Sequence, residues 1–363
     1  MKTIGYEEAN SYLRWLKEEG IPVIEGWAIP DVKKVPLHPW PRTGGLGVYV
    51  NLTGSEETTG GYICEIPPGG TLKPEKHVYE ELIYVVSGKG TASVWNEDQI
   101  DRKQTFEWQA GSVFAPPLNA WHQFSNTQSD TPARFFALTS ARVHMNLFHN
   151  PEFIFNNDFV FTDRFNGESN YFSGHGELID CWSHPVWETN LVKDARSFEI
   201  PPFPRFGPGS RLMNLELSSN TLEAHISEFA AGTYKKAHRH VGGAHIIILS
   251  GKGYTLVWSE GQPKEKLDWV EGTVMAVPEA LFHQHFPLGT KPGRQLAFRW
   301  DNKKYRYGKW YGMDIDVKHG GGQIEYDDEE PEIRKMYEAE LAKEGLKSQM
   351  DESLYRKSAR KDG

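Results

Sequence analysis

Residues 237–253 read AHRHVGGAHIIILSGKG, and this stretch decides both the fold and the site. Three histidines, His238, His240 and His245, precede an aliphatic run that closes on Gly-Lys-Gly. A β-branched and aliphatic run bounded by glycines is typical of a buried strand followed by a tight turn. Residues 75–90, EKHVYEELIYVVSGKG, repeat the strand and the turn but keep only one of the histidines.

The repeat extends well beyond these two stretches. The Gly-Lys-Gly turn at 88–90 and Trp95 recur, at one constant offset, as the turn at 251–253 and Trp258. Further blocks follow in the same order: GSVFAPPLNAWHQF (111–124) matches GTVMAVPEALFHQH (272–285), and ARFFAL (133–138) matches GRQLAF (293–298). Four blocks with nearly equal spacing indicate a tandem duplication. Each copy reads as short strands joined by a glycine-rich hairpin turn, which predicts a sandwich or barrel in each half.

Composition limits the class of protein. The chain has 363 residues, 38% of them hydrophobic, which is enough to bury two globular cores. A formal net charge of −9 argues against nucleic acid as a partner. No apolar run approaches the roughly 20 residues of a membrane span, and the N-terminal residues do not resemble a signal peptide. Two cysteines, Cys64 and Cys181, are too few for a disulfide framework. We therefore expect a cytoplasmic protein.

Helical spacing is confined to the ends of the chain. Residues 6–19 and 331–346 carry it, and the second of these segments begins with Pro331, a good first residue of a helix. One face of that segment is apolar and carries Ile333, Met336, Tyr337 and Leu341. We divide the chain into an N-terminal helical segment (1–28), a first β-domain (29–145), an ordered connector (146–200), a second β-domain (201–325) and a C-terminal helix (326–363).

Strand geometry brings some of the histidines together. Residues two apart on a strand face the same way, so His238 and His240 share a face. The later block with Pro278 supplies His283 from a different strand of the same barrel. Three neutral imidazoles that converge from two strands suit a divalent first-row metal.

These blocks resemble the two cupin motifs, namely His-x-His, a glutamate position, a strand and Gly, followed later by Gly, Pro and His. The resemblance covers both halves and implies a bicupin in which each half is a double-stranded β-helix (jelly roll). It implies His238, His240 and His283 as metal ligands, whereas the glutamate position falls on Ala244. This pattern is similar to the gentisate and salicylate 1,2-dioxygenases, which hold Fe(II) with three histidines. It speaks against a manganese oxalate decarboxylase role for this half.

Two further histidines lie near this set. By strand parity His245 faces away from His240, but a bulge at Gly242-Gly243 would turn it inward as a metal ligand. His285 shares the face of His283, so we expect it to contact the substrate or a metal ligand. The alternative for His285 is a hydrogen-bonded histidine of the core.

The first half departs from the cupin motif in another way. It keeps His77, Glu81 and His122 but has Glu75 in place of the leading histidine. Two imidazoles with carboxylates still suit non-haem iron or another divalent ion. The alternative is a cupin site without metal, in which Glu81 pairs with His77 or a nearby lysine. The resemblance to bicupins implies that one half carries the chemistry.

The expected reaction follows from the charge of the second site. Three neutral ligands leave Fe(II) its full charge, which favours a substrate that brings anionic oxygens, such as a hydroxy-aromatic acid, a catecholate or an enolised dicarbonyl. We expect an Fe(II)-dependent dioxygenase that uses O2 to cleave a carbon–carbon bond in the second half. One alternative is an O2-independent Mn(II) or Zn(II) decarboxylase, lyase or isomerase that works at the first site, and another is a binding protein without turnover. We also expect a homo-oligomer, because bicupins commonly associate.

Overall fold

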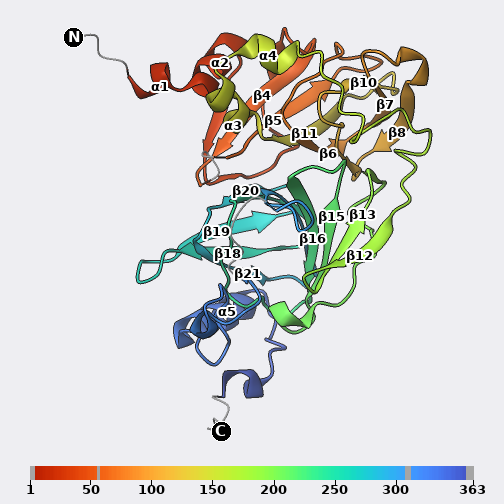
Figure 1. The fold of residues 1–363 in the computed structure, drawn as a ribbon. Helices are drawn as coiled ribbons and strands as arrows, with labels where there is room; N and C mark the ends of the chain where they lie inside the picture. Colours follow the sequence, from red (N-terminus) through yellow and green to blue (C-terminus); the bar gives the residue numbers. More distant parts are fainter. Residues whose placement is uncertain (1–4, 55–57, 307–311, 357–363) are drawn as a thin grey trace.

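The computed structural model describes residues 5–54, 58–306 and 312–356. It is built mainly from β-strands, arranged in two similar halves that lie one above the other in Figure 1. Each half contains one eight-stranded sheet and one three-stranded sheet. The predicted fold class, all-β with two tandem domains and helices at the ends, is confirmed.

The sheets of the first half follow the order β1-β4-β5-β11-β6-β9-β14, with β3 beside β4, and β10-β7-β8. Their strands are β1 (Val23–Gly26), β3 (His38–Trp40), β4 (Gly45–Leu52), β5 (Gly60–Ile66), β6 (Glu81–Ser87), β7 (Lys89–Trp95), β8 (Gln104–Gln109), β9 (Val113–Phe114), β10 (Trp121–Asn126), β11 (Ala133–Thr139) and β14 (Leu191–Val192).

The sheets of the second half follow the order β12-β13-β15-β16-β22-β17-β20-β2 and β19-β18-β21. Their strands are β2 (Ala28–Ile29), β12 (Glu177–Cys181), β13 (His184–Glu188), β15 (Arg211–Glu216), β16 (Leu222–Phe229), β17 (Ala244–Ser250), β18 (Lys252–Trp258), β19 (Glu265–Val270), β20 (Val274–Val277), β21 (Phe282–Pro287) and β22 (Gly293–Trp300). The α-helices are α1 (Tyr6–Ala9), α2 (Ser11–Glu19), α3 (Ala141–Phe148), α4 (Pro151–Phe155) and α5 (Pro331–Lys343).

The two halves exchange short strands, so the predicted domain boundaries do not divide the sheets cleanly. β2, near the N-terminus, pairs with β20 of the second half, whereas β14, from the predicted connector, pairs with β9 of the first half. The connector also contributes β12 and β13 to the large sheet of the second half. Each exchanged strand satisfies backbone groups at a sheet edge that would otherwise be unpaired.

The two large sheets pack against each other and form the interface between the halves. Phe136 stacks near Phe298 across this interface, with ring centroids 6.4 Å apart. Glu80 adds a polar link, because its carboxylate accepts hydrogen bonds from the backbone N–H groups of Thr221 and Leu222 at 2.8–2.9 Å. The apolar side chains buried here come from both halves and include Val50, Leu52, Ile63, Leu82, Leu138, Leu215, Ala224, Ile226, Ile247 and Leu296.

The Gly-Lys-Gly turns are corners between sheets, and the predicted hairpins are wrong. β17 pairs with β20 and β22, whereas β18 pairs with β19 and β21, so the chain leaves one sheet and enters the other at Gly251. Gly251 has φ +88° and Gly88 has φ +86°, a conformation that costs glycine little. At Gly253 a Cβ atom would come within 2.1 Å of the Phe286 carbonyl oxygen, so the strand requires glycine there.

The terminal helices pack onto their own halves of the chain. The predicted N-terminal helix is divided into α1 and α2 at Asn10, whose side chain accepts a hydrogen bond from the Leu13 N–H. α5 lies against the outer face of the three-stranded sheet of the second half, where Tyr254 and Leu256 are buried (Figure 1). Most of the apolar stripe of α5 is thus covered within the chain, which weakens one reason to expect a homo-oligomer. The oligomeric state stays a prediction.

Only part of the predicted stripe of α5 is buried. Leu341 is fully buried, whereas 37% of Met336 is exposed. We predict that Leu341→Ala lowers the free energy of unfolding by about 2–5 kcal/mol, because it leaves a cavity, and that Met336→Ala changes it by less than about 0.5 kcal/mol. Denaturant unfolding of both variants measures this. Equal losses in the two variants would contradict the packing of α5.

Candidate metal centres

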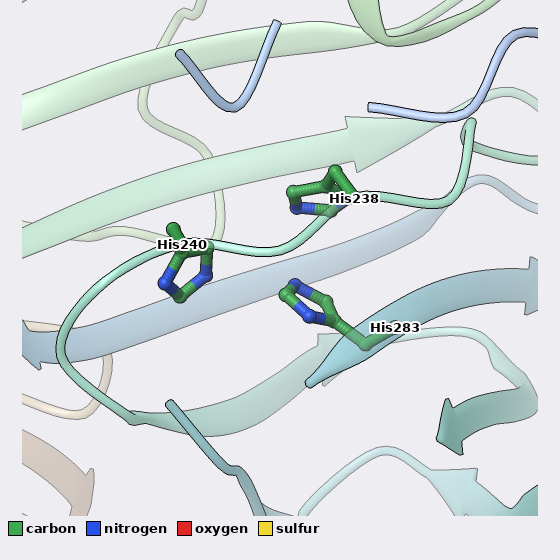
Figure 2. A group of neighbouring side chains, drawn as sticks. All are labelled: His238, His240 and His283. Carbon is green, nitrogen blue, oxygen red and sulfur yellow. The ribbon is translucent and has the colours of Figure 1, made fainter. Parts of the chain in front are cut away.

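Three histidines of the second half surround one small space (Figure 2). His238 and His240 lie on the extended segment before β17, which is not a regular strand, and His283 is on β21. His238 and His283 form a two-residue bridge, in which each backbone N–H donates to the other's carbonyl oxygen at 3.1 and 2.9 Å. One ligand nitrogen from each of the three rings lies within 4.8 Å of the others.

Backbone carbonyls fix the tautomer of all three rings. The Nδ1 atoms of His238, His240 and His283 lie 3.1–3.2 Å from the carbonyl oxygens of Lys236, Val241 and Leu281. A carbonyl oxygen only accepts hydrogen bonds, so each Nδ1 carries the proton and each Nε2 keeps its lone pair. This is the arrangement in which an imidazole binds a metal ion.

Burial keeps the three rings uncharged. Desolvation lowers the pKa of His238 and of His240 well below 6.5, and it lowers the pKa of His283 to about 3. The nearby charge of Lys235 lowers all three further. Because a protonated ring cannot bind metal, this environment holds the ligands ready for a cation.

Lys235 is a residue of the site that sequence reasoning missed. Its side chain is fully buried, and its Nζ lies 2.9 Å from His238 Nε2 and 4.1 Å from the centre of the Phe206 ring. Burial lowers the pKa of Lys235 well below its usual value, and Arg299 and Lys303 lower it further. The lysine precedes the His-x-His motif in an irregular segment, so no periodic pattern marks it.

The other two histidines lie on different sheets, His285 on β21 of the three-stranded sheet and His245 on β17 of the eight-stranded sheet. His285 faces the same interior as His283, and its Nδ1 lies 2.8 Å from the Thr255 hydroxyl. His245 lies outside the cluster, beside Phe136 of the first half, so its expected role as a ligand is wrong. The glycines at 242–243 do not reverse the alternation, because Ala244 lines the same cavity as His238 and His240, whereas His245 does not.

A small cavity of about 20 Å³ adjoins the three histidines. None of the side chains that surround it, within the part of the chain that the structure describes, is acidic. Arg299 lies close behind and binds Glu223 through Nε and Nη2 at 3.0 and 2.5 Å. The lining residues are Phe206, Leu212, Asn214, His225, Ser227, Lys235, His238, His240, Ala244, Ile246, His283, His285, Gln295, Ala297 and Met313.

The first half contains a second group of possible ligands, His77, Glu81 and His122. The Nε2 atoms of the two histidines lie 3.7 and 3.8 Å from Glu81 Oε2, and all three atoms are buried without a hydrogen-bond partner among the described residues. The Tyr62 hydroxyl donates to the other oxygen of Glu81. Burial alone would raise the pKa of Glu81, but the nearby His77 and His122 lower it, and so does the hydrogen bond from Tyr62.

Glu75 lies beside this group without belonging to it. Arg42 holds one oxygen of Glu75 in an ion pair, and the other oxygen is 3.9 Å from His122 Nε2. Arg42 also pairs with Glu19 of α2 at 2.9 Å. An arginine distant in sequence thus holds Glu75 in an ion pair, and the ligand role of Glu75 stays a prediction.

Comparisons with known proteins agree with this architecture. Residues 62–139 match the family model of the cupin domain. The chain is similar to the Mn(II)-containing oxalate decarboxylase of Bacillus subtilis, with 16% identity, a TM-score of 0.51 and coverage of 78% of this chain and 79% of that one. It is also similar to the Lactobacillus farciminis oxalate decarboxylase formate complex, with 15% identity, a TM-score of 0.51 and coverage of 76% and 86%.

The chain has the fold of a bicupin. No curated protein sequence matches it, so the comparisons establish the fold and say nothing of the reaction. The closer resemblance to gentisate and salicylate dioxygenases stays a prediction. Among the described residues, no helix is long and apolar enough to cross a membrane.

Both centres fit a divalent metal ion. The second half offers three nitrogen lone pairs, and the first half offers two nitrogens and a carboxylate oxygen that have no hydrogen-bond partner among the described residues. Nitrogen ligands suit Fe(II), Mn(II) and Zn(II) alike, so the donor sets do not select one of them.

We predict that each chain binds two divalent ions. His283→Ala should remove one of them and His77→Ala the other, because each leaves only two ligands at its own centre. Calorimetric titration of metal-stripped protein with Mn(II) measures both stoichiometries. If wild-type protein binds only one Mn(II) ion per chain and His77→Ala still binds one, metal binding is restricted to the second half.

A further prediction concerns pH. Burial lowers the pKa of His245 from 6.5 to about 3. Below about pH 6.5 the unfolded chain protonates this histidine and the folded chain does not, so stability falls as the pH is lowered from about 6.5 toward 3. His245→Leu should flatten this decline by about 1 kcal/mol per pH unit. Urea unfolding of metal-free protein at pH 7 and pH 5, with the exposed His38→Leu as control, measures it. If the free energy of unfolding falls equally with pH in His245→Leu and His38→Leu, the prediction is refuted.

Proposed function

We propose that this bicupin is a divalent-metal enzyme that cleaves a carbon–carbon bond of a small carboxylic acid in the cavity of its second half. The observation that carries this proposal is the neutral three-histidine centre, which opens on a cavity whose described lining residues include a buried lysine and no acidic side chain. His238, His240 and His283 would hold the ion. A divalent ion there supplies a positive charge that orients and polarises the oxygen atoms of the substrate.

The charges around the cavity favour an anionic substrate. Neutral imidazoles leave the dipositive charge of the ion uncompensated, and Lys235 and Lys303 are buried nearby. Glu223 lies behind the cavity and is already engaged by Arg299. Because buried charges are costly unless they are paired, a negative ligand stabilises this arrangement.

The size of the cavity favours a substrate of few atoms. Its roughly 20 Å³ hold the centres of about one or two waters. An aromatic ring would require the lining side chains to move, whereas a short acid requires much less. This favours decarboxylation, the activity named for the two oxalate decarboxylases of similar fold, over cleavage of an aromatic ring.

His285 is placed to donate a hydrogen bond to the substrate during decarboxylation, and the proton that the reaction takes up comes from water. Loss of CO2 breaks the bond to the carboxylate carbon and leaves its electron pair on the neighbouring carbon, which then takes up one proton. Trp269 Nε1 donates to the Thr255 hydroxyl at 3.1 Å, and that hydroxyl can donate to His285 Nδ1 at 2.8 Å. The proton of His285 then resides on Nε2, across the ring from Thr255, where it is available to the cavity.

Oxidative cleavage by Fe(II) and O2 is the second candidate. The observation that favours it is the same set of three neutral ligands, which leaves coordination positions for a chelating substrate and for O2. A small enolised dicarbonyl or hydroxy acid fits the cavity better than a catecholate. This candidate uses the same histidines and differs in its consumption of O2.

We predict that His240→Ala abolishes turnover and releases the metal of the second half, whereas His77→Ala keeps most of the activity. The reason is that two ligands do not retain a labile divalent ion. The assay follows CO2 release and O2 consumption with two- to four-carbon oxo, hydroxy and dicarboxylic acids, after anaerobic purification and metal analysis.

CO2 release without O2 consumption supports decarboxylation, and O2 consumption supports the second candidate. An active His240→Ala together with an inactive His77→Ala would move the chemistry to the first half. Absence of bound metal and of turnover would leave a binding protein and refute the proposal.

A further inference from the structure

The two halves can be compared residue by residue through their strand pairing. Tyr62 lies opposite Ala137 in the first half, and His225 lies opposite Ala297 in the second. Phe135 pairs with Cys64, and Gln295 occupies the same register position opposite Ser227. The duplicated frame therefore shows which side chain replaces which inside the two barrels.

Two more positions correspond through matching hydrogen bonds. The Leu72 N–H donates to the Phe124 carbonyl oxygen at 2.9 Å, and the Lys235 N–H donates to the His285 carbonyl oxygen at 3.3 Å. Lys235 thus takes the place of Leu72, and His285 that of Phe124.

The first half uses these positions as ordinary core. Leu72, Phe124 and Phe135 are each 4% exposed and belong to one apolar cluster, and the two phenylalanine rings have centroids 5.6 Å apart. The second half buries Lys235, His285 and Gln295 equally deeply. Replacing apolar core by buried polar groups costs stability unless each group finds a partner.

Several of these polar groups have no partner of their own. Gln295 Nε2 and His225 Nδ1 are buried without a hydrogen bond to any described residue. The hydrogen bond of Lys235 Nζ is to His238 Nε2, the atom that a bound metal requires. With the ion in place, the Lys235 amino group needs a different acceptor, and none of the described lining residues carries a carboxylate.

We propose that Lys235, Gln295 and His285 form a recognition site for a second carboxylate of the substrate, so that the substrate class is a short dicarboxylate or its oxo derivative. One carboxylate of the substrate faces the three-histidine centre, and the other is held by the lysine and the glutamine amide. The ring centroids of His238 and His285 are 6.5 Å apart, so both ends fall within one small molecule. This inference rests on the proposed function, because it assigns the substrate class of the same cavity.

The donors match a carboxylate in number and charge. An ammonium and an amide N–H can each bind one carboxylate oxygen, and hydrogen bonds to ionised groups are the stronger ones. A neutral hydroxyl or methyl group would leave the lysine buried and unpaired.

The test is calorimetric titration of Mn(II)-loaded protein with oxalate, malonate and succinate, compared with acetate. Wild-type protein should bind one of the dicarboxylates at least about tenfold more tightly than acetate. Lys235→Leu and Gln295→Phe introduce the residues that the first half has at the corresponding positions, Leu72 and Phe135. The first half buries these residues, so both variants are expected to fold. Each variant should lose about tenfold or more of dicarboxylate affinity and keep its acetate affinity and Mn(II) content.

Lys236→Leu is the matched control, because this neighbouring lysine pairs with Glu325 at 2.6 Å instead of lining the cavity. It should leave every affinity unchanged. If Lys235→Leu and Gln295→Phe still bind the dicarboxylate more tightly than acetate, the recognition site is overturned. The same holds if Lys236→Leu loses as much dicarboxylate affinity as they do. Neither outcome touches the proposed function. Failure of wild-type protein to bind Mn(II) or acetate would overturn the proposed function and this inference with it.

Discussion

Both centres depend on a short antiparallel bridge with two hydrogen bonds. In the second half this bridge joins His238 to His283, and in the first half it joins Glu75 to His122. Because side chains alternate along extended backbone, a slip of one residue would turn the ligand of either strand to the opposite face. The bridge therefore fixes which side chains meet inside each barrel, and the glycine corners and exchanged strands support it by holding the sheets in register.

The two halves share one backbone fold but surround their candidate metal centres with side chains of different charge. The first half places carboxylates and an arginine beside its histidines and packs apolar side chains beneath them. The second half has no carboxylate at the ligand position, since Ala244 stands where the repeat has Glu81, and the side chains around the space include Lys235 and several polar groups. A cation in the first half is thus largely neutralised by the protein, whereas one in the second half needs an anionic ligand.

Sequence reasoning found the parts of this account that local patterns encode. The tandem repeat and the spacing of His238, His240 and His283 follow from residues close together in the chain. Lys235 lies outside the repeated blocks and became informative only when matching backbone hydrogen bonds aligned it with Leu72. Gln295 lies in a repeated block, where it matches Phe135, and became informative only when the structure placed it in the wall of the cavity. The pairing of Glu75 with Arg42 and the position of the sheet corners depend on long-range contacts, which no local pattern reports.

Anomalous X-ray diffraction from crystals grown with Mn(II) tests the central claim most directly, namely that the neutral histidines of the second half hold the ion that acts on an anionic substrate. The account predicts an anomalous peak at coordination distance from the Nε2 atoms of His238, His240 and His283, with Lys235 turned away from His238. Anomalous signal confined to the centre of the first half, with Lys235 still on His238, would contradict it.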